Sequence, residues 1–133
     1  MKKTTLLILA TVTICCCKKR GNDYSASKDD LLNKWEIRKS VGGIGGIANY
    51  QPGNGYIFEF KSDNTFVNYE KGNIVQSGTY DLRSTSENDK FRITFHTTVR
   101  DLSQDATLKG DTLVLLKSSP CCDIPDNIFV RIN

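Results

Sequence analysis

The sequence predicts an all-β protein, a small antiparallel up-and-down barrel of eight strands. Three observations support this fold class. After residue 33, apolar residues recur at every second position in short runs. Turns rich in Gly, Asn and Asp separate these runs. No amphipathic segment between them is long enough for a crossover helix, which argues against a parallel sheet. A two-sheet sandwich is the alternative, and a barrel is favoured because it leaves no exposed edges.

The N-terminal segment, residues 1–16, has the composition of a signal peptide. A basic start precedes an apolar run over residues 4–14 and then three consecutive Cys. The run is too short to cross a bilayer, which takes about 20 residues, and a transmembrane anchor or a buried strand is the alternative interpretation. A Cys directly after such a run resembles the lipidation site of bacterial lipoproteins. Cys17 fits that resemblance best, with Cys16 and Cys15 as alternatives.

Cleavage before Cys17 divides the chain into three parts. Residues 1–16 are the lipoprotein signal peptide, residues 17–30 a polar flexible tether, and residues 31–133 the folded domain. The resemblance implies palmitate-type lipidation and a Gram-negative cell envelope, with the protein anchored in the outer membrane. The basic residues 18–20 favour its periplasmic side. The full chain has a net charge of only +3, so no nucleic-acid partner is expected.

The expected elements follow in order. Residues 30–33 form a helical turn or lead into the first strand, and Gly78 indicates a bulge or bend in a later one. Residues 98–103 are ambiguous. The expected strands cover residues 34–40, 56–61, 65–70, 74–82, 90–96, 105–109, 112–117 and 127–132.

Several short motifs within residues 31–131 resemble the lipocalin-like domain of bacterial lipoproteins. They are the segment around Trp35, a Gly-rich stretch after the first strand, Ser-Asp-Asn-Thr-Phe, Ser-Gly-Thr-Tyr, and a last strand that contains Arg131. The family's Gly two residues before the Trp is replaced by Asn33. The resemblance implies a barrel with a cavity for a hydrophobic ligand. It also implies that Trp35 closes one barrel end and that Arg131 packs over it.

The sequence contains few residues that would indicate a catalytic or a metal site. His96 is the only His, and no nucleophile motif accompanies it, so no enzyme activity, cofactor or metal is expected. The Gly-rich segment 41–50 formally fits a dinucleotide fingerprint but lacks the following helix. The adjacent Cys121 and Cys122 leave three alternatives open: a strained vicinal disulfide, two free thiols, or one buried Cys.

The function predicted from these observations is binding of a small hydrophobic or amphipathic ligand inside the barrel. The candidate ligand-binding residues are aromatic: Tyr50, Tyr56, Phe58, Phe60, Tyr69 and Tyr80. The alternative is an envelope interaction or inhibitor protein with a filled barrel. In that case the apolar, Gly-rich loop 41–55 would contact a protein partner.

Overall fold

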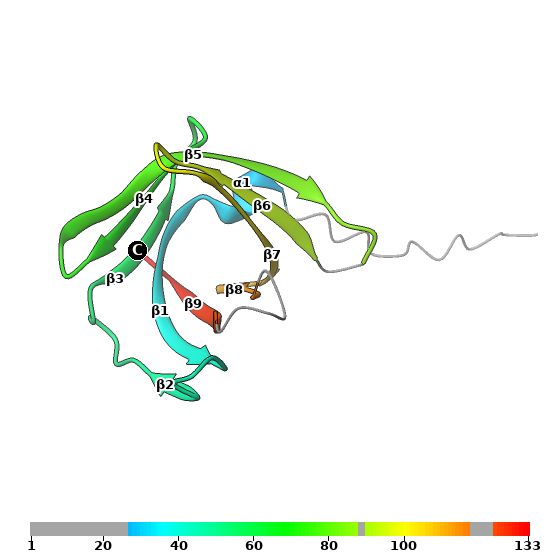
Figure 1. Ribbon diagram of the computed structural model, residues 1–133. Helices are drawn as coiled ribbons and strands as arrows, with labels where there is room; N and C mark the ends of the chain where they lie inside the picture. Colours follow the sequence, from blue (N-terminus) through cyan, green and yellow to red (C-terminus); the bar gives the residue numbers. More distant parts are fainter. Residues whose placement is uncertain (1–26, 88–89, 118–123) are drawn as a thin grey trace, which may run out of the picture.

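The structure, a computed structural model, describes residues 27–87, 90–117 and 124–133. Its strands form one antiparallel sheet that closes on itself through pairing of the first strand with the last (Figure 1). The predicted all-β fold and the closed up-and-down barrel of eight strands are therefore confirmed. The predicted signal peptide, Cys15 to Cys17, and the Cys121–Cys122 pair lie outside the described residues.

The barrel strands follow one another in chain order, as hairpin connections require. One additional strand, β2, extends the sheet beside β1 within the loop predicted over residues 41–55. The strand bounds are β1 Asn33–Val41, β2 Ile47–Asn49, β3 Tyr56–Phe60, β4 Thr65–Glu70, β5 Asn73–Ser84, β6 Phe91–His96, β7 Asp101–Lys109, β8 Thr112–Leu115 and β9 Asp126–Ile132.

A short helix, α1 (Lys28–Leu31), covers one end of the barrel. It begins within the segment predicted as tether, because Ser27 and Asp30 form a capping box that satisfies its first N–H groups. Leu31 is fully buried, and its carbonyl accepts a hydrogen bond of 2.8 Å from the Trp35 indole. The domain therefore includes residues before the predicted boundary at residue 31.

The same end holds the Trp and Arg that the family resemblance singles out. Trp35 is completely buried, and the Arg131 guanidinium carbon lies 4.7 Å from the centre of its ring. Arg131 also donates a hydrogen bond of 2.7 Å to the Asp30 carbonyl and lies 3.3 Å from a carboxylate oxygen of Asp111. Arg131 thus joins α1, the Trp35 ring and the β7–β8 turn.

Stacked aromatic side chains fill the adjacent part of the barrel. The Phe58 ring lies 5.1–5.4 Å from the rings of Phe60, Phe66 and Phe95, measured between centroids. Such distances are typical of favourable aromatic pairs. The wider core consists of Leu31, Trp35, Ile37, Phe58, Phe60, Phe66, Tyr80, Phe91, Ile93, Phe95, Ala106, Leu108, Leu113, Leu115 and Phe129.

The segment from Gly42 to Gly55 is held by its backbone and by one buried carboxylate. The β1–β2 hairpin closes with a hydrogen bond of 2.8 Å from the Gly42 N–H to the Gly46 carbonyl. Glu36, 3% exposed, then accepts hydrogen bonds from the N–H groups of Gly53 and Gly55 and an ion pair from Arg38. Burial alone would raise the pKa of Glu36, but these hydrogen bonds outweigh it, and the pKa lies below its ordinary value.

Several strand bounds differ from the sequence prediction, and those of β7 differ most. β7 runs without interruption from Asp101 to Lys109 and includes the second half of the ambiguous segment 98–103. Cross-strand pairs with β6 stabilise it: Arg92 with Asp105 at 2.7 Å, and Thr94 with Ser103 at 3.0 Å. β8 ends at Leu115 rather than at residue 117.

Candidate functional site

The candidate site is an opening in the barrel wall beside the first half of β5. β6 pairs with β5 only from Ser84 to Thr79, and its last pair joins Thr79 to His96. The preceding residues of β5, 73–78, pair with β4 on one side. On the other side, no backbone hydrogen bond within the described part of the chain joins them to the turn 97–100. We call residues 73–78 the free edge of β5.

Gly78 lies next to the point where the two strands separate. A Cβ atom built on Gly78 would lie 2.0 Å from the His96 carbonyl oxygen and 3.2 Å from the Phe66 ring. Only glycine therefore allows the end of β6 to cross β5 so closely. The bulge of β5 lies at Val75, whereas Gly78, where the sequence predicted a bulge or bend, pairs in regular register with Phe66. Past His96 the chain leaves β6 and continues into residues 97–100.

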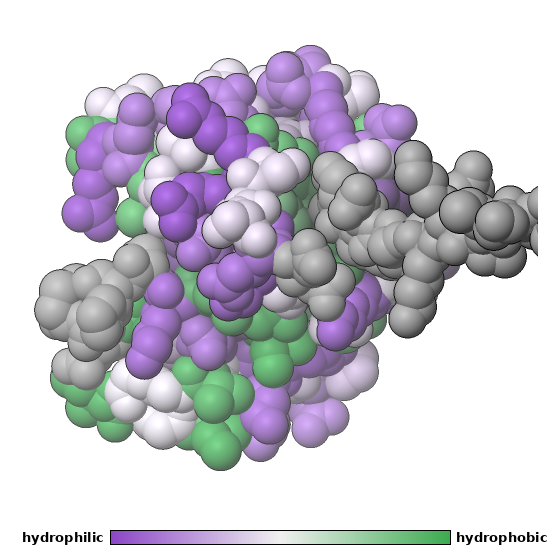
Figure 2. All heavy atoms as spheres, turned by 90° about the vertical axis from the view of Figure 1, so that its right-hand side faces the viewer, coloured by the Kyte–Doolittle hydropathy of each residue, from purple (hydrophilic) through white to green (hydrophobic). Residues whose placement is uncertain are grey.

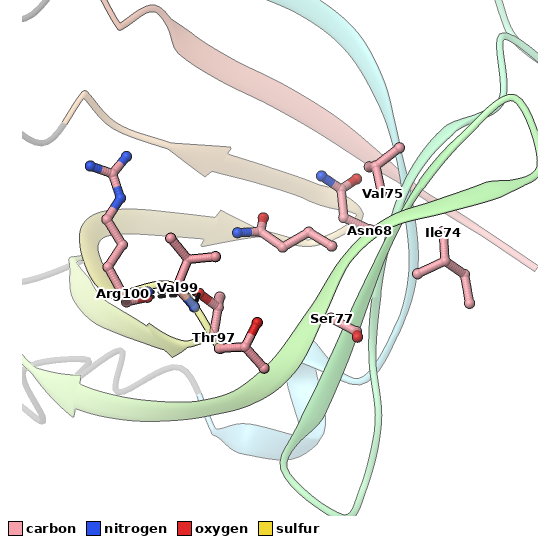
Figure 3. Close-up of a pocket in the computed structure, with 9 residues that line it drawn as sticks. Asn68, Ile74, Val75, Ser77, Thr97, Val99 and Arg100 are labelled. Carbon is pink, nitrogen blue, oxygen red and sulfur yellow. Dashed lines mark hydrogen bonds between the residues drawn. The ribbon is translucent and has the colours of Figure 1, made fainter.

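A pocket of about 560 Å³ lies between the free edge and this turn (Figure 3). Its volume falls within the range of about 300–1,000 Å³ that is typical of small-ligand sites. Figure 3 shows the turn with Thr97, Val99 and Arg100 on one side of the pocket and β5 on the other. The lining residues are Asn68, Ile74, Val75, Gln76, Ser77, Thr97, Thr98, Val99 and Arg100.

The lining combines exposed aliphatic groups with amides and hydroxyls. Val99 is 87% exposed, and Ile74 and Val75 are also exposed. Asn68 is two residues from the buried Phe66 and pairs across the sheet with Gln76, so both amides belong to the interior face of the strands. A pocket lined by both aliphatic groups and amides suits an amphipathic molecule.

Local hydrogen bonds fix the shape of the turn. The Thr97 hydroxyl accepts hydrogen bonds from the N–H groups of Val99 and Arg100 and donates one of 2.8 Å to the Arg100 carbonyl. This arrangement leaves the Val99 side chain exposed at the rim. Arg100 is the one charged residue in the lining, and within the described ranges it has no ion pair.

The aromatic residues predicted to bind ligand lie elsewhere. Phe58, Phe60 and Tyr80 are buried in the aromatic core, and the Phe60 and Tyr80 ring centres are 5.1 Å apart. Tyr50 and Tyr56 form an edge-to-face pair at 5.9 Å and pack against the border of the core. None of the five lines the pocket beside β5.

Tyr69 differs most from its expected place, because it lies on the outer face of the barrel. Its hydroxyl donates a hydrogen bond of 2.9 Å to Glu59, which lies between the inward-facing Phe58 and Phe60. The physical reason is the two-residue period of the strand: Phe66 faces inward, so the positions with its parity are 68 and 70. Tyr69 instead lines a small outer groove of about 190 Å³ with Lys34, Ile57 and Gly72.

His96 lies on the outer face, between two carboxylates. Its Nε2 atom is 3.0 Å from Asp81, and its Nδ1 atom is 3.0 Å from Asp101. The hydrogen bond with Asp81, followed by that with Asp101, raises the pKa of His96 above its ordinary value of 6.5. Both ring nitrogens are therefore engaged, which suits a pH-sensitive structural link across β5, β6 and β7.

The described residues contain no group of three or more His, Cys, Asp or Glu side chains arranged to hold a metal ion. Within the same residues, no helix is both long and apolar enough to span a bilayer. Comparisons with protein-family models, with curated proteins and with solved structures find no match for this chain.

Sequence reasoning did not identify the residues of the pocket. Its lining comes from β4, β5 and a turn that belongs to no recognised motif. The one available signal was the pair of aliphatic residues 74–75 at the start of a strand, next to a Gly-containing bend. Their exposure depends on where β6 ends, and strand register is not visible in single residues.

Proposed function

We propose that this protein is a lipid-anchored binding protein of the bacterial envelope that takes up a small amphipathic molecule at the opening beside β5. The observation that carries the proposal is the pocket of about 560 Å³, which is lined by aliphatic groups together with the amides of Asn68 and Gln76. Its composition fits a ligand with an apolar part and a polar or anionic head near Arg100.

The packing of the barrel supports this position over the barrel centre. The Phe58 ring packs against the rings of Phe60, Phe66 and Phe95, so a ligand between them would have to separate these aromatic pairs. Each such pair contributes roughly 0.5–1.5 kcal/mol beyond the burial of its surface. A ligand at the opening beside β5 avoids that cost.

Native mass spectrometry of the full chain, extracted from its own membrane, tests the proposal. We expect a bound small molecule of constant mass on the wild-type protein. The variant Val99→Asp places a carboxylate at the pocket rim and should lose this adduct. Ile44→Asp is the matched control, because Ile44 is 91% exposed on the β1–β2 hairpin and Val99 is 87% exposed. Equal occupancy in both variants, or no adduct on the wild type, would refute the proposal.

Lipid anchoring is tested separately. The proposal rests on the charged start, the short apolar run and the Cys that follows. Cys17→Ser should abolish labelling with a palmitate analogue in a bacterial host and release the mature protein from the membrane fraction. Labelling that persists would move the attachment site to Cys16 or Cys15.

A second candidate function is contact with a protein partner through loop 41–55. Ile44 and Ile47 are 91% and 62% exposed on the β1–β2 hairpin. Hydrophobic groups lie at the bottom of Figure 2, where Figure 1 places this hairpin. This candidate predicts that Ile44→Asp, and not Val99→Asp, removes a protein cross-linked to the chain in its membrane.

A further inference from the structure

We infer that the pocket beside β5 takes an extended peptide segment with an acidic group, which adds as a short strand to the free edge of β5. This inference rests on the proposed function, because it names the chemical class of the ligand at the same site. The backbone of β5, the sequence of its free edge and the charge of the pocket support it.

Ser77 pairs with Val67 of β4, but within the described sheet it has no partner on the β6 side. The Tyr80 N–H donates a hydrogen bond of 2.8 Å to the Asn64 carbonyl on the β4 side. Backbone direction alternates along a strand, so Gly78 also faces β4, whereas Ser77 and Thr79 face β6. Thr79 has His96 opposite it, but β6 has ended before Ser77. The N–H and C=O of Ser77 therefore point into the pocket, ready to pair with another strand.

The sequence of the free edge does not protect it from pairing. Natural proteins cover or charge exposed sheet edges, or place Pro in them, to prevent association. Residues 74–77 read Ile-Val-Gln-Ser and contain neither a charge nor a Pro. A bulge at Val75 limits the regular edge to Ser77 and its neighbours. These features favour a short strand of a few residues over a long sheet-to-sheet contact.

The charge and shape of the pocket restrict further which peptides can fit it. The turn 97–100 bounds the pocket on the side opposite β5, so an inserted strand would lie between two walls. Arg100 is the charged lining residue, which favours a segment with an acidic side chain or a terminal carboxylate. The exposed Val75 and Val99 would contact the peptide's aliphatic side chains.

The test measures binding of a defined peptide to the full chain in detergent micelles. The probe is fluorescein-Gly-Gly-Thr-Val-Thr-Val-Glu, with fluorescence anisotropy as the readout. The control peptide is identical except for N-methyl groups on both Val residues, which remove backbone donors and leave the side chains in place. We expect the control to bind about tenfold more weakly, the effect of losing one to two backbone hydrogen bonds. Equal affinities would overturn the inference, as would no binding of either peptide at millimolar concentration.

Protein variants provide an independent readout. Ser77→Pro removes the edge N–H at a position where it makes no ladder bond, and Pro is tolerated in edge strands. This variant should bind the unmethylated peptide about tenfold more weakly than the wild type, while its thermal unfolding stays cooperative. Arg100→Glu should also weaken binding, and Arg83→Glu, a charge-matched change on β5 outside the pocket, should not. If Arg100→Glu binds the peptide as well as the wild type does, the pocket does not prefer an acidic peptide. This outcome is independent of the result with Ser77→Pro.

Hydrogen exchange locates the bound peptide. Amide exchange measured by mass spectrometry should slow in segments covering residues 73–79 and 96–101 when the peptide is added. Protection elsewhere, or a dimer held together through two β5 edges, would overturn the inference. If the peptide does not bind, and the wild type still carries an adduct that Val99→Asp loses, then the ligand is not a peptide and the proposed function stands. If the native adduct is absent, the proposed function itself fails.

Discussion

The substitution Gly78→Ala tests the geometry on which the site depends. The added methyl carbon would lie 2.0 Å from the His96 carbonyl oxygen, 3.1 Å from its carbonyl carbon and 3.2 Å from the Phe66 ring. The nearest atom is backbone, so no side-chain rotation relieves the clash. The end of β6 must move by about an ångström, and such overpacking typically costs about 1–3 kcal/mol.

The displacement should also break the last ladder contact between Thr79 and His96, which adds about 1 kcal/mol. We therefore expect Gly78→Ala to lower the free energy of unfolding by about 2–4 kcal/mol. For a domain of roughly 100 residues, each 1 kcal/mol lowers the Tm by about 4–8 °C. Urea titration followed by Trp35 fluorescence measures the free energy, and a thermal melt measures the Tm.

Gly45→Ala is the matched control. A Cβ atom on Gly45 meets nothing within 4 Å, and its backbone is outside the left-handed region. This change should alter the free energy of unfolding by less than about 0.5 kcal/mol. If Gly78→Ala is as stable as Gly45→Ala, β6 does not cross β5 at this point, and the account of the opening is wrong.

Three further substitutions test side chains that support the barrel. Glu36→Gln should destabilise the fold by about 1.5–3 kcal/mol, because it weakens hydrogen bonds to a charged acceptor. It should also speed amide exchange at Gly53 and Gly55, and unchanged exchange there would contradict the anchoring role of Glu36. The lowered pKa means that this stabilisation is present above about pH 4.5 and is lost as the pH falls. Trp35→Phe should cost about 2–4 kcal/mol in urea titration followed by circular dichroism, because the Leu31 carbonyl loses its donor and Arg131 loses the indole. A loss below about 0.5 kcal/mol would refute this. His96 has a raised pKa, so its link to Asp81 and Asp101 is fully present below pH 6.5 and is lost as the pH rises through the folded-state pKa. His96→Gln should therefore flatten the stability profile between pH 6 and 8, and an unaltered slope would contradict it.

Local sequence patterns predicted the barrel because alternation survives in single strands. Phe91, Ile93 and Phe95 alternate with polar residues, and all three are buried. Both faces of β7 carry polar as well as apolar residues, so the sequence left its first half ambiguous. Pairing with β6 defines it as a strand. Tyr69 was assigned to the interior by residue type, whereas strand parity places it outside.

The candidate site was harder to predict because it depends on stagger between strands. Nothing in the sequence specifies that β6 ends opposite Thr79, and this register alone separates the free edge of β5 from the paired half. The exposure of Val99 likewise results from a turn whose hydrogen bonds involve only the hydroxyl of Thr97. Such features follow from closure of the whole barrel, with its fixed shear, rather than from local propensity.

The central claim is that the opening beside β5 holds the ligand. The most direct measurement is an experimental structure of the full chain purified from its own membrane, with the co-purified molecule retained. The account predicts density that does not belong to this chain between Ser77 and Val99, within reach of Arg100. Density among the rings of Phe58, Phe60 and Phe66, or a pocket that holds only water, would contradict it.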